Sequence, residues 1–444
     1  MHMHDIIRLA IKGAESEGAN DCEVYVATTS EAEVFIENND LKQAKSQDSA
    51  ALGVRVLLSG SLGFYAVNSV APDKVKQAAA MAVKMARVSP RDRFNSLPSG
   101  RSRVASVRGI YDKKAEAFKA GDAVRLAAEM LQAAKSDSRV SVDSGNFTAA
   151  LVRHWLGNSN GTLLSERLSA FAWSVMGMAI DGNDVSSFDV QSGSSHSVKG
   201  INVLSAAEEF SQTVVNSLGA RKIDSFKGEM LLTPAAAIEL VEEAVEHSIN
   251  SDSVQKKSSR FAGKIGRRIA SPLLTIEDDA TNPQGLAASS FDREGVAHRR
   301  NVVVEKGVLK KFLYNTYTAR KGGVRSTGNA SGSTTSPPSV AATNFIVAPG
   351  RQSVDSLVSE IKHGILISRF SGNVNPVDGD FSGVVKGGRI IKNGELSHSV
   401  KEVMVAGNIF ACLKNLTGLS KERKVMHSSI LPYMRFGGVS FTGG

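Results

Sequence analysis

Acidic and imidazole side chains gather in one short stretch of the chain. Residues 234–249 read PAAAIELVEEAVEHSI and contain Glu239, Glu242, Glu243, Glu246 and His247. Carboxylates and imidazoles bind zinc, and a carboxylate next to a metal-bound water can act as a general base. In a helix, spacings of three and four place the glutamates on one face. The stretch therefore suits a metal or acid–base site, and equally an amphipathic helix with a solvated acidic face.

Other segments carry weaker chemical signals. Residues 326–333, STGNASGS, look like a phosphate-binding loop but lack the Lys-Ser/Thr ending of a P-loop. Asp378-Gly379-Asp380 holds only part of a calcium loop, so a tight turn is the better interpretation. The chain has no Gly-x-Ser-x-Gly elbow, no cysteine-protease signature and no dinucleotide fingerprint. The candidate chemistry is thus concentrated in the acidic stretch.

The elements that must position this stretch lie in residues 221–444. The stretch predicts a helix from Pro234 to Ile249, with its apolar residues on the opposite face from the glutamates. Many short strands follow, with turns at Lys306-Gly307 and Asn393-Gly394, and a second helix is expected at Asn408–Leu416. We expect a β-rich domain that carries one important helix.

The first half of the chain predicts two units of similar order, 1–100 and 101–220. Each has a helix, antiparallel strands and a closing helix. The predicted helices are residues 4–18, Asp73–Val88, Asp122–Ala134 and Ala206–Leu218. Turns are expected at Asn38-Asn39-Asp40, at Ser59-Gly60 and at the hairpin Asn158–Gly161, and residues 89–110 read as a linker. The predicted fold class is therefore α+β, with a C-terminal domain at 221–444.

Composition indicates an ordinary intracellular protein. Hydrophobic residues make up 42% of the 444 and charged residues 22%, and the two cysteines, Cys22 and Cys412, suit a reducing compartment. No apolar run reaches the roughly 20 residues of a membrane span, and no secretory signal is visible. The net charge of +9 comes with short basic clusters at Arg87–Arg93 with Arg101 and Arg103, at Lys264–Arg268 and at Lys421–Lys424. We expect a cytoplasmic location, no membrane partner and no specific nucleic-acid binding.

Several motifs in order resemble one protein family. The acidic helix with its sequel, EEAVEHSINSDSVQKKSSRFAGKIG, is followed by SSFDREGV, LKKFLYNTYTARKGGVRSTGNA, NPVDGDFSG, VMVAGN and SSILPYM. These segments resemble the TldD/PmbA metalloprotease family, and in particular its PmbA/TldE branch. The resemblance covers nearly the whole chain and is most specific over residues 228–444.

The resemblance assigns roles to residues of the acidic helix. Catalytic relatives carry an HExxxH motif, in which two histidines bind zinc and the glutamate is the general base. Here Glu242 stands at the first histidine, Glu243 at the base and His247 at the second histidine. The family's third ligand, a late cysteine, matches Met426, with His427 beside it.

Helix geometry also disfavours a shared metal for Glu242 and His247. Residues five apart on a straight helix point about 140° away from each other. Relatives have a glycine before the second histidine, whereas Glu246 stands there in this chain and favours a regular helix. We therefore expect a lost zinc site and no cofactor in this chain.

The resemblance implies a partner and a peptide groove. The region from Gly328 to Asn344 matches one near the substrate peptide, so Asn329, Val340, Thr343 and Asn344 are candidate peptide-binding residues. The predicted function is a non-catalytic subunit that completes a zinc-bearing TldD-type partner, or that self-associates as a homodimer, in the processing of unfolded peptides.

Two alternatives stay open at this point. The first is an active metallopeptidase with zinc held by Glu242, His247 and His427 and with Glu243 as base, since a carboxylate and two imidazoles form a legitimate zinc set. The second is a DNA-binding or gyrase-modulating protein, because the family carries the label of a gyrase modulator.

Overall fold

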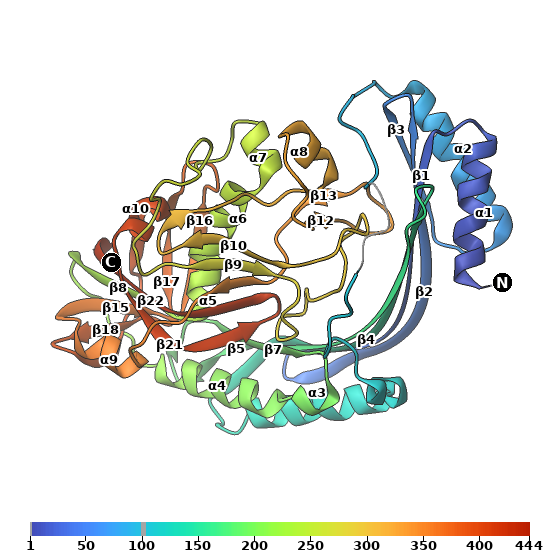
Figure 1. Ribbon diagram of the computed structural model, residues 1–444. Coiled ribbons are helices and arrows are strands. Elements are labelled where there is room, and N and C mark those ends of the chain that lie inside the picture. Colours follow the sequence, from blue (N-terminus) through green and yellow to red (C-terminus); the bar gives the residue numbers. More distant parts are fainter. Residues whose placement is uncertain (1, 99–103) are drawn as a thin grey trace.

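A long, curved sheet lies beside a second, β-rich body in the computed structural model (Figure 1). The structure describes residues 2–98 and 104–444. Arg101 and Arg103 of the predicted basic cluster, and the predicted boundary at 100/101, lie outside the described residues. The α+β fold class expected from the sequence is confirmed.

The N-terminal sheet has seven antiparallel strands in the order β3-β2-β1-β4-β5-β6, with β7 paired to β5. Their bounds are β1 Asp21–Glu37, β2 Asp40–Leu58, β3 Ser61–Val67, β4 Val140–Asn158, β5 Leu163–Asp181, β6 Asp184–Val185 and β7 Asp189–Ser195. The turns predicted at residues 38–40, 59–60 and 158–161 all separate strands. Strand β1 runs without a break over all 17 of its residues.

The two predicted N-terminal units share this sheet. Strand β1 of the first unit pairs with β4 of the second from Glu23↔Asn158 to Glu37↔Ser144. The polar middle of β1 stays extended because β2 and β4 pair with it on both sides.

Four helices cover one face of the sheet. They are α1 Met3–Ser16, α2 Pro72–Val88, α3 Ala120–Ala134 and α4 Val203–Asn216, with the short 3₁₀ turns η1 Lys113–Ala117 and η2 Val198–Gly200. Even-numbered residues of β1 point to this face: Val24 packs under α1 and α2, and Val34 packs under α3 and α4. The C-terminal domain lies on the other, concave side (Figure 1). Among the described residues, no helix is long and apolar enough to cross a membrane.

The C-terminal domain is built on a mixed 13-stranded sheet whose main path is β11-β10-β9-β14-β22-β8-β15-β18-β19. Its strands are β8 Phe226–Leu232, β9 Ile276–Asp279, β10 Arg300–Glu305, β11 Val308–Leu309, β14 Phe345–Val347, β15 His363–Ile367, β16 Arg369–Val374, β17 Asp380–Lys386, β18 Arg389–Lys392, β19 Glu395–Ser399, β20 Met404–Asn408, β21 Leu416–Met426 and β22 Ser429–Thr442. A separate pair is formed by β12 Ala330–Ser331 and β13 Ser339–Val340. Short helices α7 Ser251–Gln255, α8 Thr316–Lys321, α9 Val354–Ser359 and α10 Ile409–Lys414 lie between strands.

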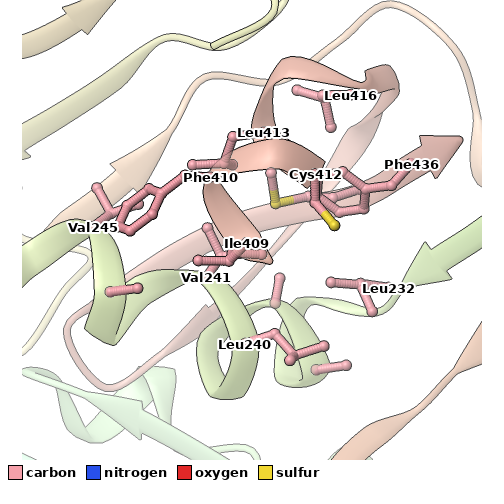
Figure 2. Close-up of a cluster of buried hydrophobic side chains, with 14 of the residues drawn as sticks. Leu232, Leu240, Val241, Val245, Ile409, Phe410, Cys412, Leu413, Leu416 and Phe436 are labelled. Carbon is pink, nitrogen blue, oxygen red and sulfur yellow. The ribbon is translucent and has the colours of Figure 1, made fainter. Parts of the chain in front are cut away.

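The predicted acidic helix runs through the core of this domain in three parts. These are α5 Pro234–Ala237, a π-helical turn Ile238–Glu242 and α6 Glu243–Ile249. Figure 2 shows its apolar face against α10: Val241 lies near Ile409 and Val245 lies near Phe410, and Leu240 belongs to the same buried cluster. This packing fixes which side chains the helix turns toward the rest of the domain.

A buried ion network joins the N-terminal sheet to the C-terminal domain. Arg55 Nη2 lies 2.7 Å from Glu23 Oε2, and its Nη1 lies 2.8 Å from Glu294 Oε1. Arg293 Nη1 lies 3.0 Å from Glu23 Oε1, and its guanidinium stacks over Tyr25. All four charged residues are at most 4% exposed. The SSFDREGV motif thus contributes two charged residues, Arg293 and Glu294, to the contact between the two bodies.

Candidate functional site

The acidic helix begins directly after a central strand. Thr233 follows β8 and caps the helix, its side chain accepting a hydrogen bond from Ala236 N, and Pro234 occupies the first turn. The expected regular helix is interrupted: a π-helical turn, Ile238–Glu242, separates the α-helical segments α5 and α6. In that turn Glu239 Oε1 accepts from Arg369 Nε at 3.0 Å and Glu239 Oε2 accepts from Phe370 N at 2.5 Å. We attribute the π turn to two constraints. The hydrogen bonds from Arg369 and Phe370 fix the carboxylate of Glu239, and the next two residues, Leu240 and Val241, are fully buried.

The acidic face is not a solvated stripe. Only Glu243 is exposed, whereas Glu242 and Glu246 are largely buried. Glu242 Oε1 accepts a hydrogen bond from Ser429 Oγ at 2.7 Å, and its Oε2 has no partner within the described chain. Burial raises the pKa of Glu242 to about 7. Burial, with the nearby charges of Glu242, Asp278 and Glu243, raises the pKa of Glu246 to about 8.

His247 turns away from Glu242. Its Nε2 lies 3.2 Å from the carbonyl of Ser258, and its Nδ1 lies 3.4 Å from the hydroxyl of Ser253. One neutral tautomer, protonated at Nε2, donates to the carbonyl and accepts from the hydroxyl. Both ring nitrogens therefore have protein partners.

The segment that matches the family's cysteine reaches the helix through a different residue. Met426 ends β21, and His427 occupies the following turn with φ 55° and an exposed side chain. The carbonyl of His427 accepts from Leu286 N at 2.8 Å. Ser429, two residues later, is the side chain that contacts Glu242. Sequence reasoning missed Ser429, although it stands in the SSILPYM motif.

The candidate ligands do not converge. Within residues 2–98 and 104–444, no group of three or more His, Cys, Asp or Glu side chains is arranged to hold a metal ion. Cys412 lies in the apolar core shown in Figure 2, where burial raises its thiol pKa to about 11. The residues present therefore do not fit the family's zinc ion, because the imidazole of His247 and one carboxylate oxygen of Glu242 are already engaged.

Two of the four candidate peptide-binding residues, Asn329 and Thr343, hydrogen-bond to a buried carboxylate, Asp278 of β9. Asp278 Oδ2 accepts from Asn329 Nδ2 at 2.7 Å, and its Oδ1 accepts from the backbone N–H and the hydroxyl of Thr343 at 2.5 and 2.8 Å. Asn344 is fully buried, and its Nδ2 donates to two backbone carbonyls. Val340 is buried in β13. Their peptide-binding role stays a prediction.

Asp278 is the second residue that sequence reasoning missed. It stands in the run IEDD, where nothing in the spacing marks it. Burial raises its pKa, and its hydrogen bonds from Asn329 and Thr343 oppose that rise. Its charge also acts on Glu246, so the helix and the loops of residues 329–344 meet at this carboxylate.

Three family models match the chain. They are the PmbA/TldA metallopeptidase domain 1 over residues 22–86, the central domain over 113–251 and the C-terminal domain over 225–443. The chain belongs to the PmbA/TldD family. The membership predicted from the motifs is thereby confirmed.

Full-length PmbA/TldD relatives share about a quarter of their residues with this chain. Metalloprotease PmbA of Escherichia coli O157:H7 is 25% identical over 97% of this chain and 94% of its own length. A metalloprotease of Methanothermobacter thermautotrophicus is 27% identical over 90% of this chain and 88% of its own.

Solved PmbA/TldD-type structures share the fold. TldE from Thermococcus kodakarensis superposes with a TM-score of 0.91 at 24% identity, covering 99% of this chain and 100% of TldE. A proposed modulator of a DNA gyrase from Thermotoga maritima gives a TM-score of 0.90 at 23% identity, with the same coverage. At these identities the likeness concerns the fold alone.

Proposed function

We propose that this chain is the non-catalytic, TldE-type subunit of a two-chain metalloprotease whose partner carries the zinc. The observation that supports this most is the separation of the three candidate ligands. His247 is held by Ser253 and Ser258, and Glu242 is held by Ser429. A catalytic zinc site needs three protein ligands directed at one point.

The charge state of the helix supports the same proposal. Glu242 and Glu246 have pKa values raised to about 7 and 8, so near neutral pH much of this pair is protonated. A protonated carboxyl group binds metal poorly, because a metal ligand must first lose its proton. Glu243, the matched general base, points to solvent.

The fold retains what a structural subunit requires. The core between the acidic helix and α10 is continuous, and the buried ion network holds the two bodies together. The role we assign to the chain is to complete the peptide chamber of a TldD-type partner that processes unfolded peptides.

Zinc content and peptidase activity of the untagged chain test this proposal. We expect less than about a tenth of an equivalent of zinc per chain in protein purified without chelators, measured by elemental mass spectrometry. Cleavage of an unstructured peptide should require added TldD-type partner and should not change with Glu243→Gln in this chain.

The opposite result would identify an active enzyme. Close to one equivalent of zinc that is lost in His247→Ala, together with activity of the chain alone that disappears in Glu243→Gln, would contradict the proposal. Ser253→Ala is the matched control, because it removes a partner of the imidazole without removing a candidate ligand.

A further inference from the structure

Within the residues that the structure describes, one edge of the N-terminal sheet is unpaired over half of its strand β2. Strand β3 pairs with β2 only from Leu52 to Leu58, while β1 pairs with nearly the whole of β2. In the described part of the chain, residues 41–51 of β2 have no strand on their outer side. The side chains of residues 42–49 are all exposed. Such an edge presents a row of backbone N–H and C=O groups to an incoming strand.

A hollow opens on the sheet beside this edge. Ser46 pairs with Ala32, Ala32 pairs with Ala149, and Ala149 pairs with Phe171, so these four side chains form one row on the helix-covered face. The three small side chains leave a hollow of about 240 Å³, walled by Ala115 and Phe118 near the start of α3. Because Ser46 belongs to the edge strand, a residue added opposite Ser46 would extend the row and stand at the mouth of the hollow.

We propose that the free edge of β2 binds an extended peptide segment as an added strand, with a large apolar side chain of that peptide seated in the hollow beside Ser46. Backbone hydrogen bonds to the edge would provide affinity for any extended sequence, and the hollow would select the side chain opposite Ser46. The inference goes beyond the proposed function, because it concerns this chain alone and holds whether or not a partner carries zinc.

The sequence of the edge argues against a second copy as the occupant. Residues 42–51 read KQAKSQDSAA and contain no large apolar side chain. Two copies paired edge to edge through this segment would leave the hollow unfilled. The rim carries both Glu31 and Lys119, so it presents no single sign of charge to a partner. A leucine or phenylalanine side chain of a bound peptide would fill the hollow, which two copies paired edge to edge would leave empty.

Fluorescence anisotropy with three labelled ten-residue peptides tests the proposal on the full chain. The first alternates Thr and Ser around a central Leu, the second replaces that Leu with Ala, and the third keeps Leu but is N-methylated at alternate backbone positions. We expect the Leu peptide to bind at least about tenfold more tightly than the Ala peptide. The N-methylated peptide should not bind, because it cannot pair with the edge.

Two matched variants distinguish the binding of a side chain in the hollow from the general effect of adding an aromatic ring to the edge strand. Ser46→Phe places an aromatic ring at the mouth of the hollow and should weaken the Leu peptide about tenfold. Gln47→Phe adds the same ring to the opposite face and should change binding less than about twofold. Equal binding of all three peptides, no binding at all, or equal effects of the two variants would overturn the proposal. A dimer of the chain that dissociates in Ser46→Phe would do so as well, since a second copy would then occupy the edge.

Discussion

At the residue scale, burial decides the chemistry of the acidic helix. Glu242 and Glu246 sit on the face that the sequence pattern leaves polar, yet both are largely buried: Ser429 at the start of β22 contacts Glu242, and Asp278 of β9 lies close enough to Glu246 to act on its charge. A carboxyl group removed from water favours its neutral form. The helix therefore carries two glutamates that hold protons near neutral pH.

Replacing Glu246 with Gln tests this directly. The pKa of Glu246 is raised from 4.5 to about 8 in the folded chain, so the folded state keeps a proton that the unfolded state releases between these values. The stability of the wild type should therefore fall as the pH rises through this range. Glu246→Gln should be close to the wild type near pH ~5 and exceed its free energy of unfolding by about 4 kcal/mol near pH ~9, because each pKa unit of the shift corresponds to about 1.4 kcal/mol. Urea titrations at both pH values measure the difference.

An exposed glutamate provides the control for this experiment. Glu208 lies on the exposed side of α4, and Glu208→Gln should change stability by no more than about 0.5 kcal/mol at either pH. If the free energy of unfolding of Glu246→Gln depended on pH as steeply as that of the wild type, the carboxyl group of Glu246 would not be the group that titrates.

At the element scale, close approach of backbones sets the packing of helices on the N-terminal sheet. Gly63 of β3 lies under α2, and a Cβ at this position would stand 2.0 Å from Ala82 O and 2.5 Å from Ala86 N. Gly121, in the first turn of α3, has no atom within 4 Å of a Cβ. A side chain at Gly63 would therefore collide with the backbone of α2, whereas a side chain at Gly121 would meet no other atom.

Alanine at each glycine should therefore have different effects. Gly63→Ala should lower the free energy of unfolding by about 2–4 kcal/mol, because α2 must move away from the sheet. Gly121→Ala should leave it unchanged or raise it by about 0.5 kcal/mol. Thermal unfolding followed by circular dichroism compares them, and equal melting temperatures would show that α2 adapts without strain.

At the scale of the whole molecule, the buried ion network couples the curved sheet to the C-terminal domain. Removing one member of a buried ion pair leaves an uncompensated charge, which typically costs about 3–5 kcal/mol. Glu23 would keep only Arg55 if Arg293 were removed. The cation stacked over Tyr25 would be lost too.

Arg293→Met should consequently destabilise the chain by about 3–5 kcal/mol and separate the unfolding of its two parts. Both tryptophans, Trp155 and Trp173, belong to the N-terminal sheet, so their fluorescence follows that sheet while circular dichroism follows the whole chain. Arg125→Met removes an exposed pair with Glu129 and should cost less than about 1 kcal/mol. Coincident transitions and similar losses in both variants would argue against coupling through the network.

The sequence by itself determined the local elements and the family. Apolar spacing located α1 to α4, turn residues such as Asn158–Gly161 and Asn393–Gly394 located hairpins, and motifs spread over the chain identified the PmbA/TldD family. These features depend on neighbours within a few residues, or on residue order alone. The union of two N-terminal units in one sheet depended on pairing between β1 and β4, which no local pattern encodes.

The tertiary structure alone decided what surrounds the candidate site. Ser429 reaches Glu242 across 187 positions, and Arg293 reaches Glu23 across 270. The π turn, the inward direction of Asn329 and Asn344, and the raised pKa values of the buried glutamates also follow from these distant contacts. Spacing along a helix shows which side chains share a face, but solvent access and hydrogen-bond partners are set by segments that fold onto that face from elsewhere in the chain.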